Sequence, residues 1–126
     1  LTKEICKNRK KLLFDGLETE LRNQPHDAAY YTELNLLDLA REKYDNGFAE
    51  YIEANYRPLD IIYTLANNFS IILLNGDGFA SSEWSLRVSL ANLNDDSYYI
   101  IGSSINQMLD NLATKYNLIN SINVSI

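Results

Sequence analysis

The residue best suited to chemistry in this sequence is Arg87, which lies in the middle of a strongly alternating segment. In Ser85-Leu86-Arg87-Val88-Ser89-Leu90, the apolar residues fall on one face, and the serines and the arginine fall on the other. This period of two is typical of a strand with one face in the core. A guanidinium held on a strand can bind a carboxylate through two parallel hydrogen bonds. On these residues alone, a carboxylate-binding site and an ordinary salt bridge on the sheet face are equally supported.

Other residues that could do chemistry have simpler explanations. His26 is the only histidine, so a zinc site or a Ser-His-acid triad lacks partners, and a structural role is favoured. Asn75-Gly76-Asp77-Gly78 lacks the lysine of a phosphate-binding loop and is predicted to be a turn. Asp95 and Asp96 stand where a helix should begin, and carboxylates there interact favourably with the helix dipole. These residues therefore indicate neither a metal site nor acid–base catalysis.

The composition indicates one domain with a substantial core. The chain has 126 residues, of which 46% are hydrophobic and 22% charged, and its formal net charge is −6. The single cysteine, Cys6, cannot form an internal disulfide, so a cytoplasmic location is expected. The acidic balance disfavours nucleic acid as a partner, and no segment is long and apolar enough to predict a membrane span. The basic run at residues 7–11 is predicted to be the solvated face of a helix.

The first half of the chain is predicted to be helical. The first helix should end at Asn23-Gln24-Pro25, and it should bury a stripe formed by Ile5, Leu12, Leu13, Leu17 and Leu21. A second helix is predicted over residues 27–44, with Asn46-Gly47 as its stop signal. A third, over residues 48–55, should bury Phe48 and Ile52.

The second half is predicted to form a helix, two strands and a final helix. Pro58 should begin a helix over residues 58–68 with an apolar stripe of Leu59, Ile62, Tyr63 and Ala66. Residues 70–74 are predicted to be a strand covered on both faces. Asn94 should cap the last helix, whose stripe is Tyr98, Ile101, Ile105, Met108, Leu112 and Tyr116. Residues 117–126 should form an edge strand or a frayed end. This order predicts an α+β fold in which helices cover a small, mostly antiparallel sheet.

Several stretches of the chain resemble one enzyme family. They are Leu73-Leu74-Asn75-Gly76-Asp77-Gly78-Phe79, Trp84-Ser85-Leu86-Arg87-Val88-Ser89-Leu90-Ala91-Asn92-Leu93, Ala28-Ala29-Tyr30-Tyr31, Asn55-Tyr56-Arg57-Pro58-Leu59-Asp60, Leu65-Ala66 and residues 98–102. Together they resemble the C-terminal small domain of the aspartate 4-decarboxylases, within the aspartate aminotransferase superfamily of fold type I pyridoxal-phosphate enzymes. The resemblance covers all but about the last ten residues, and the run from Trp84 to Leu93 is its most specific part.

The resemblance implies a role for Arg87. It matches the superfamily arginine that holds the α-carboxylate of the substrate. Gly76, Gly78, Phe79 and Trp84 match the loop that leads into this strand and would position it. Asn75 departs from the proline that generic aminotransferases carry at that point, and no catalytic role is assigned to it.

The resemblance also implies a longer parent enzyme. That parent would be a homo-oligomer that converts L-aspartate to L-alanine and carbon dioxide, with transamination as a side path. Its large domain would supply the lysine that forms a Schiff base with pyridoxal phosphate, because none of the lysines here matches that motif (Lys3, Lys7, Lys10, Lys11, Lys43 and Lys115). We therefore expect no catalytic, cofactor-binding or metal-binding residue in this chain, and no turnover by the chain alone.

On this interpretation the chain is a single domain cut from a longer protein, which its first residue, Leu1, also fits. Residues 1–22 would continue a helix from the large domain, 23–56 would be a helical insertion, 57–116 the helix–strand–strand–helix unit and 117–126 a tail. Two alternatives stay open. One is the small domain of an aspartate or other aminotransferase, and the other is a non-enzymatic module that binds carboxylates through Arg87.

Overall fold

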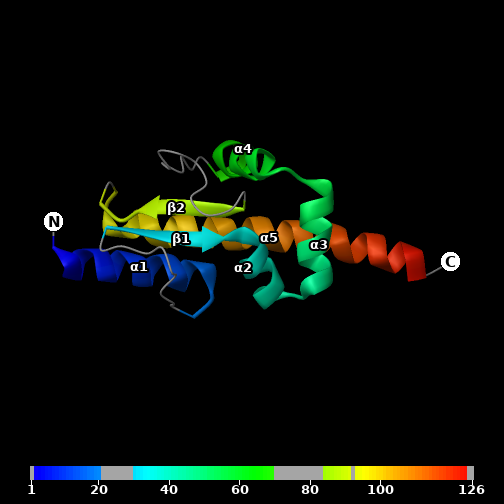
Figure 1. Ribbon diagram of the computed structural model, residues 1–126, viewed down its shortest axis with the longest axis horizontal. Coiled ribbons are helices and arrows are strands. Elements are labelled where there is room, and N and C mark those ends of the chain that lie inside the picture. The colour runs from blue at the N-terminus through cyan, green and yellow to red at the C-terminus, as the bar shows by residue number, and fades with distance from the viewer. Residues whose placement is uncertain (1, 21–29, 70–83, 92, 125–126) are drawn as a thin grey trace.

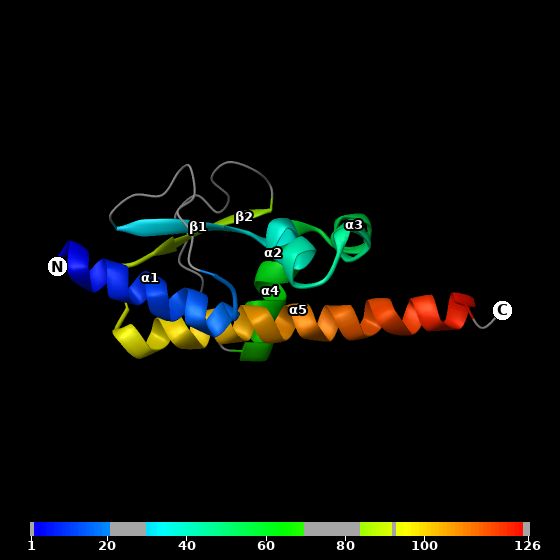
Figure 2. The same cartoon turned by 90° about the horizontal axis from the view of Figure 1, so that it is seen from below.

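The computed structural model describes residues 2–20, 30–69, 84–91 and 93–124. Along the chain, its elements are α1 (Lys3–Leu17), β1 (Tyr31–Asn35), α2 (Leu36–Lys43), α3 (Asn46–Asn55), α4 (Pro58–Phe69), β2 (Ser85–Ser89) and α5 (Asp95–Val124). The two strands pair in an antiparallel sheet, which confirms the predicted α+β class. Figure 1 shows α1 and α5 running along the sheet, and Figure 2 shows the sheet stacked on this helix pair.

Helices α1 and α5 run parallel in close contact because two glycines face each other between them. A Cβ built on Gly16 would lie 2.7 Å from the backbone nitrogen of Ser103, and one built on Gly102 would lie 2.9 Å from the backbone nitrogen of Leu17. Both distances are shorter than real Cβ atoms show, so larger residues would force the helix backbones apart. Leu13 and Leu17 are buried as predicted, whereas Ile5 is exposed, and the helix ends earlier than predicted, at a left-handed Glu18.

The predicted helix over residues 27–44 is wrong in part, and the helical insertion predicted over 23–56 contains a strand as well as helices. Tyr31–Asn35 form a strand, and only Leu36–Lys43 are helical. The side chain of Asn35 accepts a hydrogen bond from the backbone nitrogen of Asp38 at 3.0 Å, so Asn35 is the N-cap at which the helix begins. Pairing with β2 overrides the helical spacing of Leu34 and Leu37, because strand preference depends on the partner strand.

Helices α3 and α4 form where they were predicted, with corrections to their ends and faces. Asp45 caps α3, accepting a hydrogen bond from Phe48 N at 2.7 Å, so Asn46-Gly47 begin this helix instead of stopping the previous one. Among the α4 side chains that the structure describes, Ile61 and Leu65 are buried, while Leu59 and Tyr63 of the predicted stripe are exposed. The prediction for these two residues is therefore wrong, and the side chains of Ile62 and Ala66 lie outside the described part.

The last helix is longer than predicted. Its stripe from Tyr98 to Leu112 is buried and Tyr116 is partly buried, as expected, and α3 lies across it (Figure 1). The helix continues to Val124, so the predicted edge strand or frayed end is wrong through that residue. Its last turns project beyond the other elements (Figures 1 and 2), and Leu118 and Ile119 are exposed there.

The predicted strand at 70–74, the predicted turn at 75–78 and the place of His26 lie outside the described residues. Within the described ranges, none of the helices combines the length and the apolar character that crossing a bilayer requires.

Candidate functional site

The sheet presents one apolar face and one polar face. The cross-strand pairs Thr32–Val88 and Leu34–Leu86 lie on one side, and all four side chains are buried. Because successive residues of a strand point to opposite faces, the other three pairs share the second side. These pairs, which we call the polar face, are Tyr31–Ser89, Glu33–Arg87 and Asn35–Ser85. The prediction that Arg87 lies opposite the buried side chains of Leu86 and Val88 is therefore confirmed.

Arg87 lies at the centre of the polar face, between an aromatic ring and a carboxylate. Its Cζ atom is 4.4 Å from the centre of the Tyr31 ring, which is a cation–π contact. Its Nη2 atom is 3.9 Å from Glu33 Oε1, close enough for an ion pair but too far for a hydrogen bond. The Arg87 side chain is 42% exposed, whereas that of Glu33 is 6% exposed. The positive charge therefore stays accessible to solvent.

The hydrogen-bonding capacity of Arg87 is not used up within the part of the chain that the structure describes. Its Nε atom is buried and makes no hydrogen bond to any described residue. A guanidinium has five N–H donors arranged to match a carboxylate. Chemically, such a group can bind an anion, and it cannot act as a proton carrier at ordinary pH.

Uncharged polar residues lie on both sides of the central pair. Asn35 Nδ2 donates to Ser85 Oγ at 3.3 Å, and Ser89 Oγ accepts from the backbone nitrogen of Ala91 at 3.3 Å. Among the described residues of the polar face, Glu33 and Arg87 are thus the charged ones.

Of the four residues predicted to form the loop before this strand, the structure describes Trp84. Its side chain is buried in the core, and its carbonyl accepts a hydrogen bond from Leu36 N at 2.9 Å. This bond joins the start of β2 to the start of α2. Gly76, Gly78 and Phe79, together with Asn75, lie outside the described residues.

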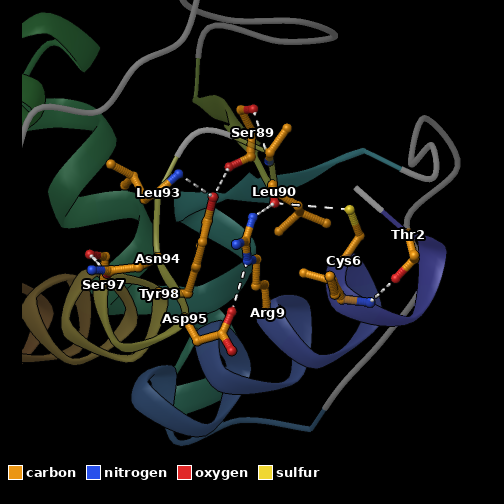
Figure 3. Close-up of polar contacts among 12 residues, drawn as sticks. Thr2, Cys6, Arg9, Ser89, Leu90, Leu93, Asn94, Asp95, Ser97 and Tyr98 are labelled. Carbon is orange, nitrogen blue, oxygen red and sulfur yellow. Dashed lines mark hydrogen bonds and ion pairs between the residues drawn. The ribbon is translucent and has the colours of Figure 1, made fainter.

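The end of β2 is fixed by a polar cluster around Arg9, shown in Figure 3. Arg9 donates from Nη1 to the carbonyl of Leu90 at 2.8 Å and from Nε to Asp95 Oδ1 at 2.9 Å. Tyr98 donates its hydroxyl to the carbonyl of Ser89 at 2.8 Å, and its ring lies 5.7 Å from the Arg9 guanidinium carbon. The bond with Asp95 raises the pKa of Arg9. This cluster ties the strand that carries Arg87 to both α1 and α5.

Three residues of this site and of the cluster that supports it were not identified from the sequence. Tyr31 and Glu33 were placed in a helix, and Arg9 was placed on a solvated face, although its side chain is only 14% exposed. The neighbours of Arg9 in the sequence give no sign of its contacts with Asp95 and Leu90, which lie 86 and 81 residues further along the chain. For β1, the cap at Asn35 and the β-favouring Tyr31 and Thr32 were the available signals.

The described residues do not fit the attachment point of pyridoxal phosphate. All the lysines lie on helices: Lys3, Lys7, Lys10, Lys11, Lys43 and Lys115. Lys43 donates to the carbonyl of Leu17 at 2.7 Å, and none lies in the strands that form the polar face. No cluster of His, Cys, Asp and Glu suited to a metal ion occurs in the described ranges. Among the described residues of the polar face, Arg87 is the group that could bind an anion.

Comparison with known proteins shows what this sequence is similar to. The sequence matches no protein-family model. Over 114 residues, which are 90% of this chain, it is 30% identical to a protein of a Pseudomonas species. The chain is similar to a bifunctional aspartate aminotransferase and L-aspartate beta-decarboxylase. The match confirms the resemblance predicted from the sequence, and the chain spans 22% of the length of that relative.

Proposed function

We propose that this chain is the C-terminal small domain of a pyridoxal-phosphate enzyme that releases carbon dioxide and L-alanine from L-aspartate. In this proposal Arg87 binds the α-carboxylate of the substrate. One observation carries it: at the centre of the polar face, the Arg87 side chain is 42% exposed, and its guanidinium makes no direct hydrogen bond to the Glu33 carboxylate, 3.9 Å away. The similarity to an aspartate aminotransferase and decarboxylase supplies the substrate class.

The surroundings of Arg87 suit carboxylate recognition. Hydrogen bonds to charged groups contribute about 1.5–3 kcal/mol each, and a guanidinium can make two such bonds to one carboxylate. The backbone position of the arginine is held by five residues of strand pairing on one side and by the Arg9 cluster just beyond the strand. A substrate carboxylate bound there would therefore have a fixed place relative to the rest of the protein.

The remaining parts of the active site belong, in this proposal, to residues outside this chain. A large domain of the same protein would supply the lysine and hold the cofactor. The loop with Gly76, Gly78, Phe79 and Trp84 would position β2 beside that domain. The proposal also includes a homo-oligomeric, cytoplasmic parent, in which residues 1–22 join the two domains.

The test uses the longer protein that carries this chain, with aspartate as substrate. Replacing Arg87 with alanine should lower kcat/KM about 100-fold or more, because two charge-assisted hydrogen bonds are lost. Arg87→Lys should recover part of the loss, since it keeps the charge but not the paired donors. Arg41→Ala is the matched control, because Arg41 is an exposed arginine on α2 paired with Asp38. If Arg87→Ala behaves like Arg41→Ala, the proposal is wrong.

Transamination is the second candidate, because the name of the relative includes both activities. It keeps the role of Arg87 and changes only the product. Measuring alanine and carbon dioxide against oxaloacetate in the same reaction separates the two. A large excess of oxaloacetate would identify an aminotransferase.

A further inference from the structure

We propose that Tyr31 is a positioning residue, whose ring orients the Arg87 guanidinium for carboxylate binding. This inference rests on the proposed function of Arg87 and extends it to the neighbouring strand. The two residues come from distant parts of the sequence and meet because β1 and β2 pair in register.

The register explains why the ring reaches the guanidinium. Glu33 lies directly opposite Arg87, and Tyr31 lies opposite Ser89, so Tyr31 is the diagonal neighbour of Arg87 on the same face. Diagonal neighbours in an antiparallel pair are within reach of aromatic and long side chains. The observed distance of 4.4 Å from Arg87 Cζ to the ring centre is well inside the roughly 6 Å limit of a cation–π contact.

Two groups of β1 restrict the guanidinium in different ways. The Cζ atom of Arg87 lies over the ring of Tyr31, 4.4 Å from its centre, in a cation–π contact. The buried carboxylate of Glu33 attracts Nη2 from 3.9 Å without forming a hydrogen bond to it. The ring contact and the ion pair thus restrict the guanidinium without a hydrogen bond between Nη2 and Glu33.

This restriction has a functional consequence. Arginine is a long side chain with many rotamers, and immobilising it on binding costs affinity. A guanidinium already held by a ring loses less freedom when the substrate binds. The aromatic ring, rather than the tyrosine hydroxyl, is therefore the part of Tyr31 that matters.

The experiment measures kcat/KM for aspartate in the longer protein that carries this chain. Tyr31→Ile removes the ring but keeps a residue suited to a strand, and it should lower kcat/KM about 10-fold. Tyr31→Phe keeps the ring and should stay within about twofold of the wild type. Tyr63→Ile replaces an exposed tyrosine on α4, is the matched control, and should change nothing.

Two further measurements test the role of Tyr31 separately from the role of Arg87. In an Arg87→Ala background, Tyr31→Ile should change kcat/KM less than about twofold, because the ring then has no guanidinium to orient. In this chain alone, the δ-methylene protons of Arg87 should show a ring-current shift that persists in Tyr31→Phe and disappears in Tyr31→Ile. The shift tests the contact even if a variant of the longer protein is inactive.

The outcomes distinguish the two proposals. If Arg87→Ala leaves kcat/KM unchanged, the proposed function itself is wrong. If Arg87→Ala is severely impaired while Tyr31→Ile matches the wild type, the role of Tyr31 is wrong and that of Arg87 stands. Equal losses in Tyr31→Phe and Tyr31→Ile would also contradict it, because the ring would then not be the active part.

Discussion

Two arginines in this molecule show how surroundings decide the use of one side chain. Arg9 donates to Asp95 and to the carbonyl of Leu90, so its hydrogen bonds fix the end of β2. Arg87 has a ring on one side and a carboxylate beyond hydrogen-bond distance, so its donors are not committed to that carboxylate. The first arginine is structural, and the second is the candidate for ligand binding.

At the residue scale, the start of α4 supplies a pH-dependent contact. The backbone nitrogen of Arg57 donates to Asp60 Oδ2 at 3.0 Å, and this bond, with help from the Arg57 side chain, lowers the pKa of Asp60. The contact is therefore fully present above the ordinary carboxyl pKa and is lost as the pH falls through the lowered value. A carbonyl-carbon NMR titration should place the Asp60 midpoint below that of a model aspartate.

The Asp60→Asn variant serves as the comparison. Its amide can still accept a hydrogen bond but does not titrate, so the acid-dependent shift changes around Arg57 and Pro58 should disappear. A midpoint at or above the model value in the wild type would contradict the assignment of this contact.

At the scale of elements, the close packing of α1 against α5 depends on glycine at their contact, where no side chain separates the two backbones. Gly102 is buried between backbones, so an added methyl group meets atoms that cannot rotate away. Gly102→Ala should destabilise the fold by about 1–3 kcal/mol despite the better helix propensity of alanine. Urea unfolding followed by circular dichroism measures the change.

Gly47→Ala is the matched control for that substitution. Its Cβ would meet the hydroxyl of Tyr116 at 2.5 Å, which is the far end of a side chain that can shift. We expect a smaller loss, below about 1 kcal/mol. If both variants unfold at the same urea concentration, close packing at Gly102 is not what holds α1 against α5.

Some of these helices and strands could be predicted from the sequence, and others could not. The strand around Arg87 was predictable because its alternation is local, and the stripe of α5 was predictable for the same reason. Strand β1 was missed because Leu34 and Leu37 fit helical spacing, while the partner that makes it a strand lies far along the chain. The polar face was thus half predicted: Arg87 was identified, but the two residues of β1 beside it were not.

At the scale of the whole molecule, the proposed function separates substrate binding from catalysis. The described part of the chain contains the arginine proposed to bind a carboxylate, and its lysines lie on helices outside the strands of the polar face. We therefore expect this chain alone, mixed with pyridoxal phosphate and aspartate, to release no alanine and to show no absorbance band of a bound cofactor. Product assay and a visible spectrum after gel filtration measure this, and either signal would contradict the expectation.

The pairing of β1 with β2 makes the surroundings of Arg87 depend on correct strand register. Side chains alternate along a strand, so a slip of one residue would carry Tyr31 and Glu33 to the opposite side and bring apolar neighbours to the guanidinium. A misaligned strand pair could keep its backbone hydrogen bonds and still lose the proposed affinity for a carboxylate. If Arg87 binds a carboxylate as proposed, the measured affinity would therefore depend on the register of β1 and β2 as well as on the arginine itself.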